Sequence, residues 1–301
     1  MSDYDVLVVG GSAAGLSGAL MLGRSRRKVL VCDSADPRNK PSPAVHAFFS
    51  RDGIAPADLM AIGREQLQPY DVTLRTTVVQ SITPGDVFTA RLEDGSTVTA
   101  RKILLATGVC DELPDIAGIH DYWGASIYHC PYCHGWEARD QPLALIASGS
   151  SSVEFILMLT QWSADLVLCT NGPAGITDAE RETLQRFNIP LYEQPIHHLA
   201  GENGQLAAIV FEDGTQLARS GAFVQPQTRL HGSLAQDLGC ALTEQGLVQV
   251  DAFGLTSVPG VYAAGDMTRP AQVLFAAAGG ALAGVMINKT LISEDHARIV
   301  A

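Results

Sequence analysis

The stretch VLVVGGSAAG, Val6–Gly15, decides the fold of this chain. It starts with four consecutive apolar residues, which predict a buried parallel strand, and ends in a glycine-rich turn. The segment Leu16–Leu22 is rich in Ala, Gly and Leu and predicts a helix, and a second apolar strand, Lys28–Cys32, ends at Asp33. This is the dinucleotide-binding fingerprint in its required context: a strand, a glycine-rich turn, a helix, a second strand and an acid, in this order.

The residues of this fingerprint have separate expected roles. Gly10 and Gly15 let the backbone approach a pyrophosphate, and the helix N-terminus supplies N–H donors and a positive dipole. Asp33 is expected to accept a hydrogen bond from a ribose hydroxyl. An ordinary tight strand–helix turn is the competing interpretation, but spacing, strands and acid agree on dinucleotide binding. The candidate binding residues here are Gly10, Ser12 (in place of the middle glycine), Ala13, Ala14, Gly15 and Asp33.

A second motif, HCPYCHGWE at His129–Glu137, contains two cysteines two residues apart. Such a pair can close and reopen a small disulfide ring, because a thiolate attacks a nearby sulfur. The same pattern also attaches c-type haem, but that requires an exported chain and no signal peptide is expected here. A zinc site would need a second ligand pair. The other cysteines are isolated, so no metal site is expected: Cys32, Cys110, Cys169 and Cys240.

Composition limits the possible functions. The 301 residues are enough for two domains, and 47% are hydrophobic, so a full core is expected. The net charge of −12 argues against nucleic acid as a partner, because such binding needs a basic surface. The longest apolar run, Phe275–Ile287, is shorter than a bilayer-spanning helix, so no membrane partner is expected. A cytoplasmic location follows as the default expectation, and there a structural disulfide is disfavoured.

A second strand–turn–helix–strand unit follows the cysteines. Leu143–Ile146 and Leu166–Cys169 predict its strands, and Val153–Trp162 predicts its helix. Only Gly149 remains of the glycines in its turn, no acid follows the second strand, and the unit contains no Arg or Lys. This pattern predicts a Rossmann unit that has lost its nucleotide, since neither a ribose nor a 2′-phosphate finds a partner.

Four further segments predict local structure. Asp-Gly turns between apolar runs predict hairpins around Glu93–Ser96 and Glu212–Gly214. Pro56–Gln68 has the pattern of an amphipathic helix. Val72–Ile82 is strand-like over its whole length, and its backbone near Val79 is placed to border an adenine.

The last motif, TSVPGVYAAGD at Thr256–Asp266, is an apolar strand that ends in an aspartate. Asp266 is placed to accept from a ribityl hydroxyl. A helix of small residues opens at Gln272 and Val273, and its N-terminus favours negative charge at one end of a flavin ring. Tight packing on a sheet is the competing explanation for the small residues.

The order of these motifs resembles the low-molecular-weight thioredoxin reductases over essentially the whole chain. The resemblance implies an α/β fold with two Rossmann-like domains, a bound FAD and a homodimer. It places the discontinuous FAD domain at residues 1–114 and 226–301, with residues 115–225 as an inserted nicotinamide-type domain that carries the cysteine pair. The expected FAD contacts outside the fingerprint are Arg38, His46, Val79, Ala106, Thr107, Gly108, Gly265, Asp266, Gln272 and Val273. Arg38 is assigned to phosphate, and His46 either to the flavin ring or to partly buried structure.

The thiol motif is closer to one branch of this family, which includes the gliotoxin and holomycin dithiol oxidases. Thioredoxin reductases commonly have an acid where His134 stands here. The branch oxidises a small-molecule dithiol and passes the electrons to oxygen. By resemblance, Cys133 is the sulfur nearer the flavin and Cys130 exchanges with substrate. His134 is the expected general base or thiolate stabiliser because imidazole exchanges protons near neutral pH, with His129 as the second candidate.

Two other functions stay open from the sequence. One is a thioredoxin reductase-like enzyme that takes electrons from NADPH, ferredoxin or another donor and reduces a protein disulfide. The other is a non-catalytic, redox-sensing flavoprotein, which the intact Cys130–Cys133 spacing disfavours.

Overall fold

The structure is a computed structural model and describes residues 2–300. Its contacts divide the chain into two compact units. The first unit contains the chain up to Lys40, Ala47–Cys110, and the chain from Thr228 onward. The second contains Asp111–Gln227 and also the short segment Pro41–His46. The sequence had placed the boundaries at residues 114/115 and 225/226 and had left Pro41–His46 in the FAD domain.

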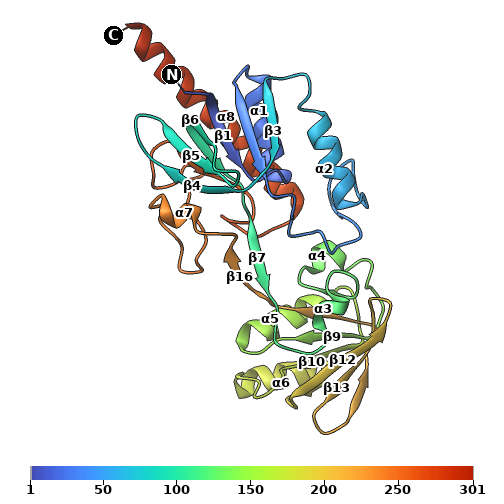
Figure 1. Cartoon of the computed structure of the whole chain (residues 1–301). Helices are drawn as coiled ribbons and strands as arrows, with labels where there is room; N and C mark the ends of the chain where they lie inside the picture. The colour runs from blue at the N-terminus through green and yellow to red at the C-terminus, as the bar shows by residue number, and fades with distance from the viewer. Residues whose placement is uncertain (1, 301) are drawn as a thin grey trace. The chain divides into compact units, whose positions relative to one another are not determined.

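The first unit is built on a seven-stranded sheet with the order β3-β2-β1-β6-β5-β4, in which β17 also pairs with β6 (Figure 1). The apolar run of β1 pairs in parallel with both neighbours, with Val6 opposite Val29 and Lys102. Both faces of β1 are covered, which is why its residues are continuously apolar. The strands are β1 (Tyr4–Val9), β2 (Val29–Asp33), β3 (Val72–Thr76), β4 (Val79–Thr83), β5 (Phe88–Leu92), β6 (Thr97–Leu105) and β17 (Val261–Ala263).

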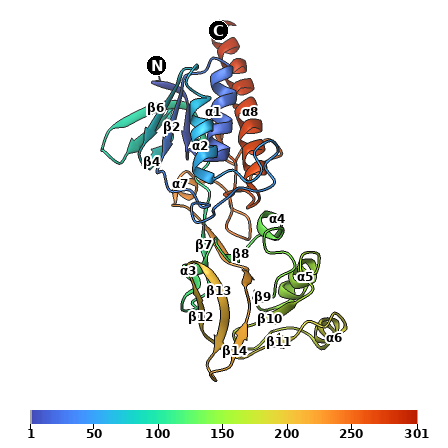
Figure 2. The same cartoon turned by 90° about the vertical axis from the view of Figure 1, so that its right-hand side faces the viewer.

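Helices α1 (Ala13–Arg24), α2 (Pro56–Glu65) and α8 (Val273–Val300) lie side by side in this unit (Figure 2). The small residues of α8 serve its packing against α1. A Cβ atom added to Gly280 would lie 1.9 Å from the backbone oxygen of Ala14. The alternative given for these small residues, tight packing, is therefore observed: α8 packs mainly against α1, and it also contacts β6 and β17 of the sheet. The short helix α7 spans Leu234–Asp237.

Helix α8 corrects one expectation from the sequence. It has 28 residues and is long and apolar enough to cross a membrane, by length and composition alone. The apolar run ends at Ile287, whereas the helix continues through charged residues to Val300. Helices packed inside globular units pass the same test, and Gly280, Ala283, Gly284, Ile287 and Leu291 of α8 are buried.

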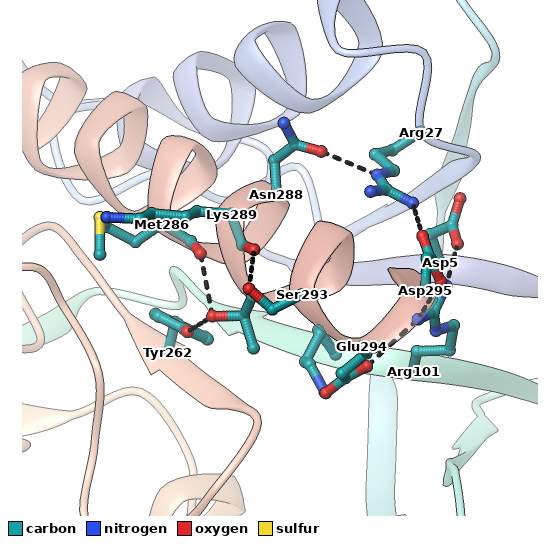
Figure 3. Close-up of polar contacts among 12 residues, drawn as sticks. Asp5, Arg27, Arg101, Tyr262, Met286, Asn288, Lys289, Ser293, Glu294 and Asp295 are labelled. Atoms are coloured by element: carbon teal, nitrogen blue, oxygen red, sulfur yellow. Dashed lines mark hydrogen bonds and ion pairs between the residues drawn. The ribbon is translucent and has the colours of Figure 1, made fainter. Parts of the chain in front are cut away.

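A network of charges fixes the C-terminal part of α8 to the sheet (Figure 3). Arg101 contacts Asp295 at 2.7 Å and Asp5 at 3.2 Å, and its side chain is only 10% exposed. Arg27 contacts the other oxygen of Asp295 at 2.8 Å. The hydrogen bond from Arg27, with that from Arg101, lowers the pKa of Asp295. Lys102 pairs with Glu294 in the same network.

We expect Arg101→Ala to reduce the free energy of unfolding by about 2 kcal/mol. The reason is that it leaves three carboxylates, those of Asp5, Glu294 and Asp295, without their nearly buried partner, although all three keep some contact with water. Urea unfolding measures the change. Arg186→Ala is the matched control, because Arg186 pairs with Glu182 on the exposed face of a helix. That change should cost less than about 0.5 kcal/mol, and equal losses from both variants would contradict a structural role for the network.

The second unit contains a parallel sheet with the order β11-β10-β9-β15-β8 and an antiparallel sheet with the order β12-β13-β14. The first of these is the predicted second Rossmann unit. Its strands are β8 (Ile127–Tyr128), β9 (Leu143–Ile146), β10 (Leu166–Cys169), β11 (Leu191–Tyr192) and β15 (Gly221–Val224). The antiparallel strands are β12 (Ile196–Glu202), β13 (Gln205–Phe211) and β14 (Gln216–Ala218). The helices are α3 (Ile119–Tyr122), α4 (Pro131–His134), α5 (Ser150–Leu159) and α6 (Asp178–Arg186).

Two chain segments that cross from one unit to the other, β7 (Val109–Glu112) and β16 (Gln227–Leu230), pair as a two-stranded sheet. Both predicted hairpins are confirmed, as β5–β6 and β13–β14. The strand-like character predicted for Val72–Ile82 is confirmed, but it belongs to two strands. The segment forms β3 and β4, which stand at opposite ends of the strand order, with β3 parallel to β2 and β4 antiparallel to β5.

Candidate active site

The fingerprint turn is closed around its glycines. A Cβ atom added to Gly15 would lie 1.8 Å from the backbone oxygen of Gly10, so the turn excludes any side chain at this point. Gly10 has a φ of +106°, and a Cβ added there would lie 2.2 Å from the backbone oxygen of Ala106. The turn Ala106–Gly108, predicted as a separate cofactor contact, is therefore brought directly against the fingerprint. Helix α1 then begins at Ala13, with Ser12 as its N-cap.

Asp33 stands at the end of β2, as the fingerprint requires. Its carboxylate accepts a hydrogen bond from the Gly11 backbone N–H at 3.1 Å and contacts Arg64 Nη2 at 3.0 Å. The side chain remains 22% exposed, which leaves room for a further donor. Sequence reasoning missed Arg64, because one arginine in the last turn of an amphipathic helix has no distinguishing pattern.

Two residues predicted as cofactor contacts from distant parts of the sequence meet in the structure. Arg38 Nη1 lies 2.8 Å from Asp266 Oδ2, and both side chains are less than a fifth exposed. Asp266 also accepts from the Ala271 backbone N–H at 3.3 Å. The predicted positions Gln272 and Val273 follow directly, at the start of α8.

These residues fit a dinucleotide. The turn at Gly10 and Gly15 has no room for a Cβ atom, and it lies at the N-terminus of the twelve-residue helix α1. There the backbone N–H groups and the helix dipole favour a pyrophosphate. Asp33 would hold a ribose, and Asp266 would hold hydroxyls of the second half. Val79 is buried in the core, so only its backbone is available to an adenine.

The two cysteines of the second unit form a disulfide. Cys130 is the N-cap of the one-turn helix α4, and Cys133 lies within it, with a Cα–Cα distance of 5.2 Å. Both are partly exposed. A Cβ added to Gly135 would lie 2.5 Å from the Pro131 backbone oxygen and 2.8 Å from Trp162 Nε1, so the turn that follows the pair must be tight.

The side chain of His134 is surrounded by three groups of the same unit. Its Nε2 lies 3.0 Å from Ser42 Oγ, its ring stacks on Tyr128 at a centroid distance of 4.6 Å, and His46 meets it edge-on at 5.9 Å. Burial, with smaller contributions from His46 and His129, lowers the pKa of His134 from 6.5 to about 4. The imidazole is therefore neutral at neutral pH and able to accept a proton.

His46 was assigned either to the flavin ring or to partly buried structure. The structure groups it with the cysteine unit, where its Nε2 lies 3.6 Å from Glu137 Oε1. His129, the second acid–base candidate, lies against the ring of Trp123 at 5.6 Å. Sequence reasoning missed Ser42 and Tyr128, because no motif connects either residue to the cysteine pair.

The carboxyl edge of the second Rossmann unit is occupied by the protein's own contacts. Thr170 Oγ1 donates to the Gly172 carbonyl at 2.6 Å, and Asn171 Oδ1 accepts from the Ile196 N–H at 2.7 Å. Glu193, directly after β11, accepts from the Ala174 N–H and from Arg181, both at 2.9 Å. The Arg181 hydrogen bonds, with that from Ala174, lower the pKa of Glu193 to about 2. The Glu193 carboxylate is therefore ionised at neutral pH, and both of its oxygens are engaged by Arg181.

The described residues offer neither a metal site nor a reactive thiol among the buried cysteines Cys32 and Cys169. Within residues 2–300, no group of three or more His, Cys, Asp or Glu side chains is arranged to hold a metal ion. Burial raises the pKa of the Cys32 thiol to about 11 and that of Cys169 to about 12. These thiols are poor nucleophiles, because the thiolate is the reactive form.

Comparison with known proteins agrees with this site. The family model described as pyridine nucleotide-disulphide oxidoreductase matches residues 4–280. The relative named thioredoxin reductase sirT, from Leptosphaeria maculans, is 33% identical, with 98% of this chain and 97% of the relative covered. The structure of HlmI is 38% identical with a TM-score of 0.94, covering 99% of this chain and 95% of that one. The structure of a putative thioredoxin reductase TrxB from Bacillus anthracis is 34% identical with a TM-score of 0.93, covering 97% and 99%.

The resemblance, the two-Rossmann fold class and the FAD cofactor predicted from the sequence are confirmed by these matches. The chain belongs to the pyridine nucleotide-disulphide oxidoreductase family, as a thioredoxin reductase-like, FAD-dependent thiol–disulfide oxidoreductase.

Proposed function

We propose that this protein oxidises a small-molecule dithiol to a disulfide and uses oxygen as the final electron acceptor. The observation that carries the proposal is the carboxyl edge of the second Rossmann unit. There the Arg181 guanidinium is paired with Glu193, and Asn171 Oδ1 already accepts from a backbone N–H, so these groups are engaged within the protein and not open to a nicotinamide dinucleotide. An enzyme of this family without a nicotinamide donor needs another source of electrons, and the substrate dithiol is that source. We also propose that it acts in the cytoplasm as a homodimer.

The cysteine pair performs two exchange steps. A substrate thiolate attacks Cys130 Sγ, forms a mixed disulfide and breaks the bond to Cys133, which leaves as a thiolate. The second substrate thiolate then attacks the substrate sulfur of the mixed disulfide, so that the substrate disulfide forms and Cys130 leaves as a thiolate. Two electrons have then moved from the substrate to the pair, and two protons have been released.

His134 acts as the proton acceptor in these steps. A neutral imidazole can take a proton from a substrate thiol, and only the resulting thiolate attacks a disulfide. Bound FAD supplies the two-electron chemistry that reoxidises the pair and reduces oxygen to hydrogen peroxide. Over the cycle, one dithiol and one oxygen molecule yield one disulfide and one hydrogen peroxide.

An anaerobic titration of the flavin absorbance tests the proposal. Dithiothreitol should bleach the flavin of the holoenzyme, NADPH should bleach it little, and admission of air should restore the colour with formation of hydrogen peroxide. A Cys130→Ser, Cys133→Ser double variant is the control and should not be bleached by dithiothreitol. Stoichiometric bleaching by micromolar NADPH would overturn the proposal and favour a disulfide reductase, the activity named for the matched relative.

A further inference from the structure

The segment Pro41–His46 brings a serine to the ring of His134. Ser42 Oγ lies 3.0 Å from His134 Nε2 and 2.8 Å from the backbone oxygen of Ala44. Ser42 stands between two prolines, whose rings fix their own φ angles and restrict the preceding residue. The segment is also held on the second unit, because Pro41 approaches Gly124 so closely that a Cβ there would lie 2.8 Å from the Pro41 backbone.

The hydrogen atoms of these contacts can be assigned by counting donors. A serine hydroxyl has one hydrogen, and a backbone carbonyl can only accept. The hydroxyl hydrogen of Ser42 therefore points to Ala44, and no backbone N–H of the described chain donates to that carbonyl in its place. Toward His134, Ser42 Oγ can then only accept, which requires a hydrogen on Nε2.

We propose that Ser42 is a positioning residue that holds His134 as the Nε2–H tautomer and so makes Nδ1 the base nitrogen. A neutral imidazole carries one N–H, so a proton on Nε2 leaves the lone pair on Nδ1. No hydrogen bond to Nδ1 is found among the residues 2–300, which leaves it available to a substrate thiol. The inference rests on the acid–base role proposed for His134 and deepens it.

The surroundings of the ring support a neutral imidazole with one fixed tautomer. Tyr128 covers one face of the ring at 4.6 Å. His46 stands at the ring edge and is itself within 3.6 Å of Glu137. His129 is a further imidazole that disfavours the charged form of the ring. No carboxylate is in contact with the ring of His134, so the serine hydroxyl is its one polar partner in the described chain.

Nitrogen NMR of the oxidised holoenzyme tests the inference. With ¹⁵N-labelled histidine rings, two-bond ¹H–¹⁵N correlations distinguish the Nε2–H from the Nδ1–H tautomer, and a His134→Gln sample identifies the signal. We expect Nε2–H in the wild type and in Ser42→Thr, which keeps the hydroxyl. We expect Ser42→Ala to show a mixture of tautomers or the Nδ1–H form. An Nδ1–H form in the wild type, or an unchanged Nε2–H form in Ser42→Ala, would overturn the inference.

Turnover of a dithiol gives the second readout. Loss of one neutral hydrogen bond should lower kcat of Ser42→Ala by roughly 3- to 10-fold, and Ser42→Thr should restore most of it. Ser96→Ala removes an exposed hydroxyl that contacts only Asp94 locally and serves as the matched control with unchanged kcat. Equal rates for wild type and Ser42→Ala would count against the role of Ser42. The tautomer is measured without oxygen or dithiol, so a failure of the proposed oxidase activity is seen separately.

Discussion

Replacing either Cys130 or Cys133 with serine is expected to abolish dithiol turnover, with FAD content unchanged. A serine hydroxyl neither forms a disulfide nor leaves as a thiolate, so both exchange steps are lost with either variant. The two residues belong to the second unit, whereas the dinucleotide cradle lies in the first, so FAD binding should not depend on them. Oxygen consumption with dithiothreitol measures the activity, and the flavin spectrum of the denatured protein measures FAD.

The two variants also separate the roles of the sulfurs. If Cys133 is nearer the flavin, Cys130→Ser leaves its thiolate beside oxidised flavin and a long-wavelength absorbance band should appear, whereas Cys133→Ser should show none. The reverse pattern would exchange the roles. Cys110→Ser is the matched control, because Cys110 is a partly exposed thiol outside the pair. If this control lost turnover and the pair variants kept it, the pair would not be the reactive centre.

Replacing His134 with alanine is expected to lower dithiol turnover by roughly 10²- to 10⁴-fold, the range of a lost acid–base group. The imidazole is half-buried, neutral and next in sequence to Cys133, so no other group takes over its proton easily. His129→Ala should have a much smaller effect, since that ring packs on Trp123. Stopped-flow reduction of the flavin by dithiothreitol measures both variants. A larger loss with His129→Ala would transfer the acid–base role to His129.

The depressed pKa of His134 gives this prediction a pH signature. The acidic decline of kcat/KM that belongs to His134 should lie near pH 4, where the ring gains its proton, and should be absent in His134→Ala. The titratable groups that face the ring are His46, His129, Tyr128 and, behind His46, Glu137. The free energy of unfolding also decreases as the pH falls. Between about pH 6.5 and 4 the unfolded chain binds a proton that the folded chain does not, so stability falls as pH falls through this window.

The features that could be predicted from the sequence are those that depend on residues close together in the chain. The fingerprint around Gly10, the hairpin turns and the Cys130–Cys133 spacing each fit within a short window, where backbone sterics and turn chemistry decide the structure. At Val72–Ile82 the same reasoning identified strand character but not the division into two strands with different neighbours. A strand pattern records which faces are buried, but it does not record which strand becomes the neighbour.

The missed parts of the site come from contacts between distant residues. Ser42 lies 92 positions before His134, and Arg64 lies 31 positions after Asp33. Neither side chain changes the local pattern of its segment, so no window of sequence contains the signal. Arg38 and Asp266 were each predicted as cofactor contacts from separate motifs, but their 2.8 Å contact appears only when the chain folds.

The grouping of Pro41–His46 with the second unit has a consequence for engineering and for inheritance of the domain. A segment copied as residues 111–227, alone or grafted into another flavoprotein, would carry the disulfide without Ser42 and His46. Its His134 would lose both its polar partner and the imidazole at its edge. The second unit therefore cannot be transferred complete as one continuous stretch of sequence. Two residues that contact His134, Ser42 and His46, are encoded near the start of the chain, so a recombination event between the two stretches separates the base from these partners.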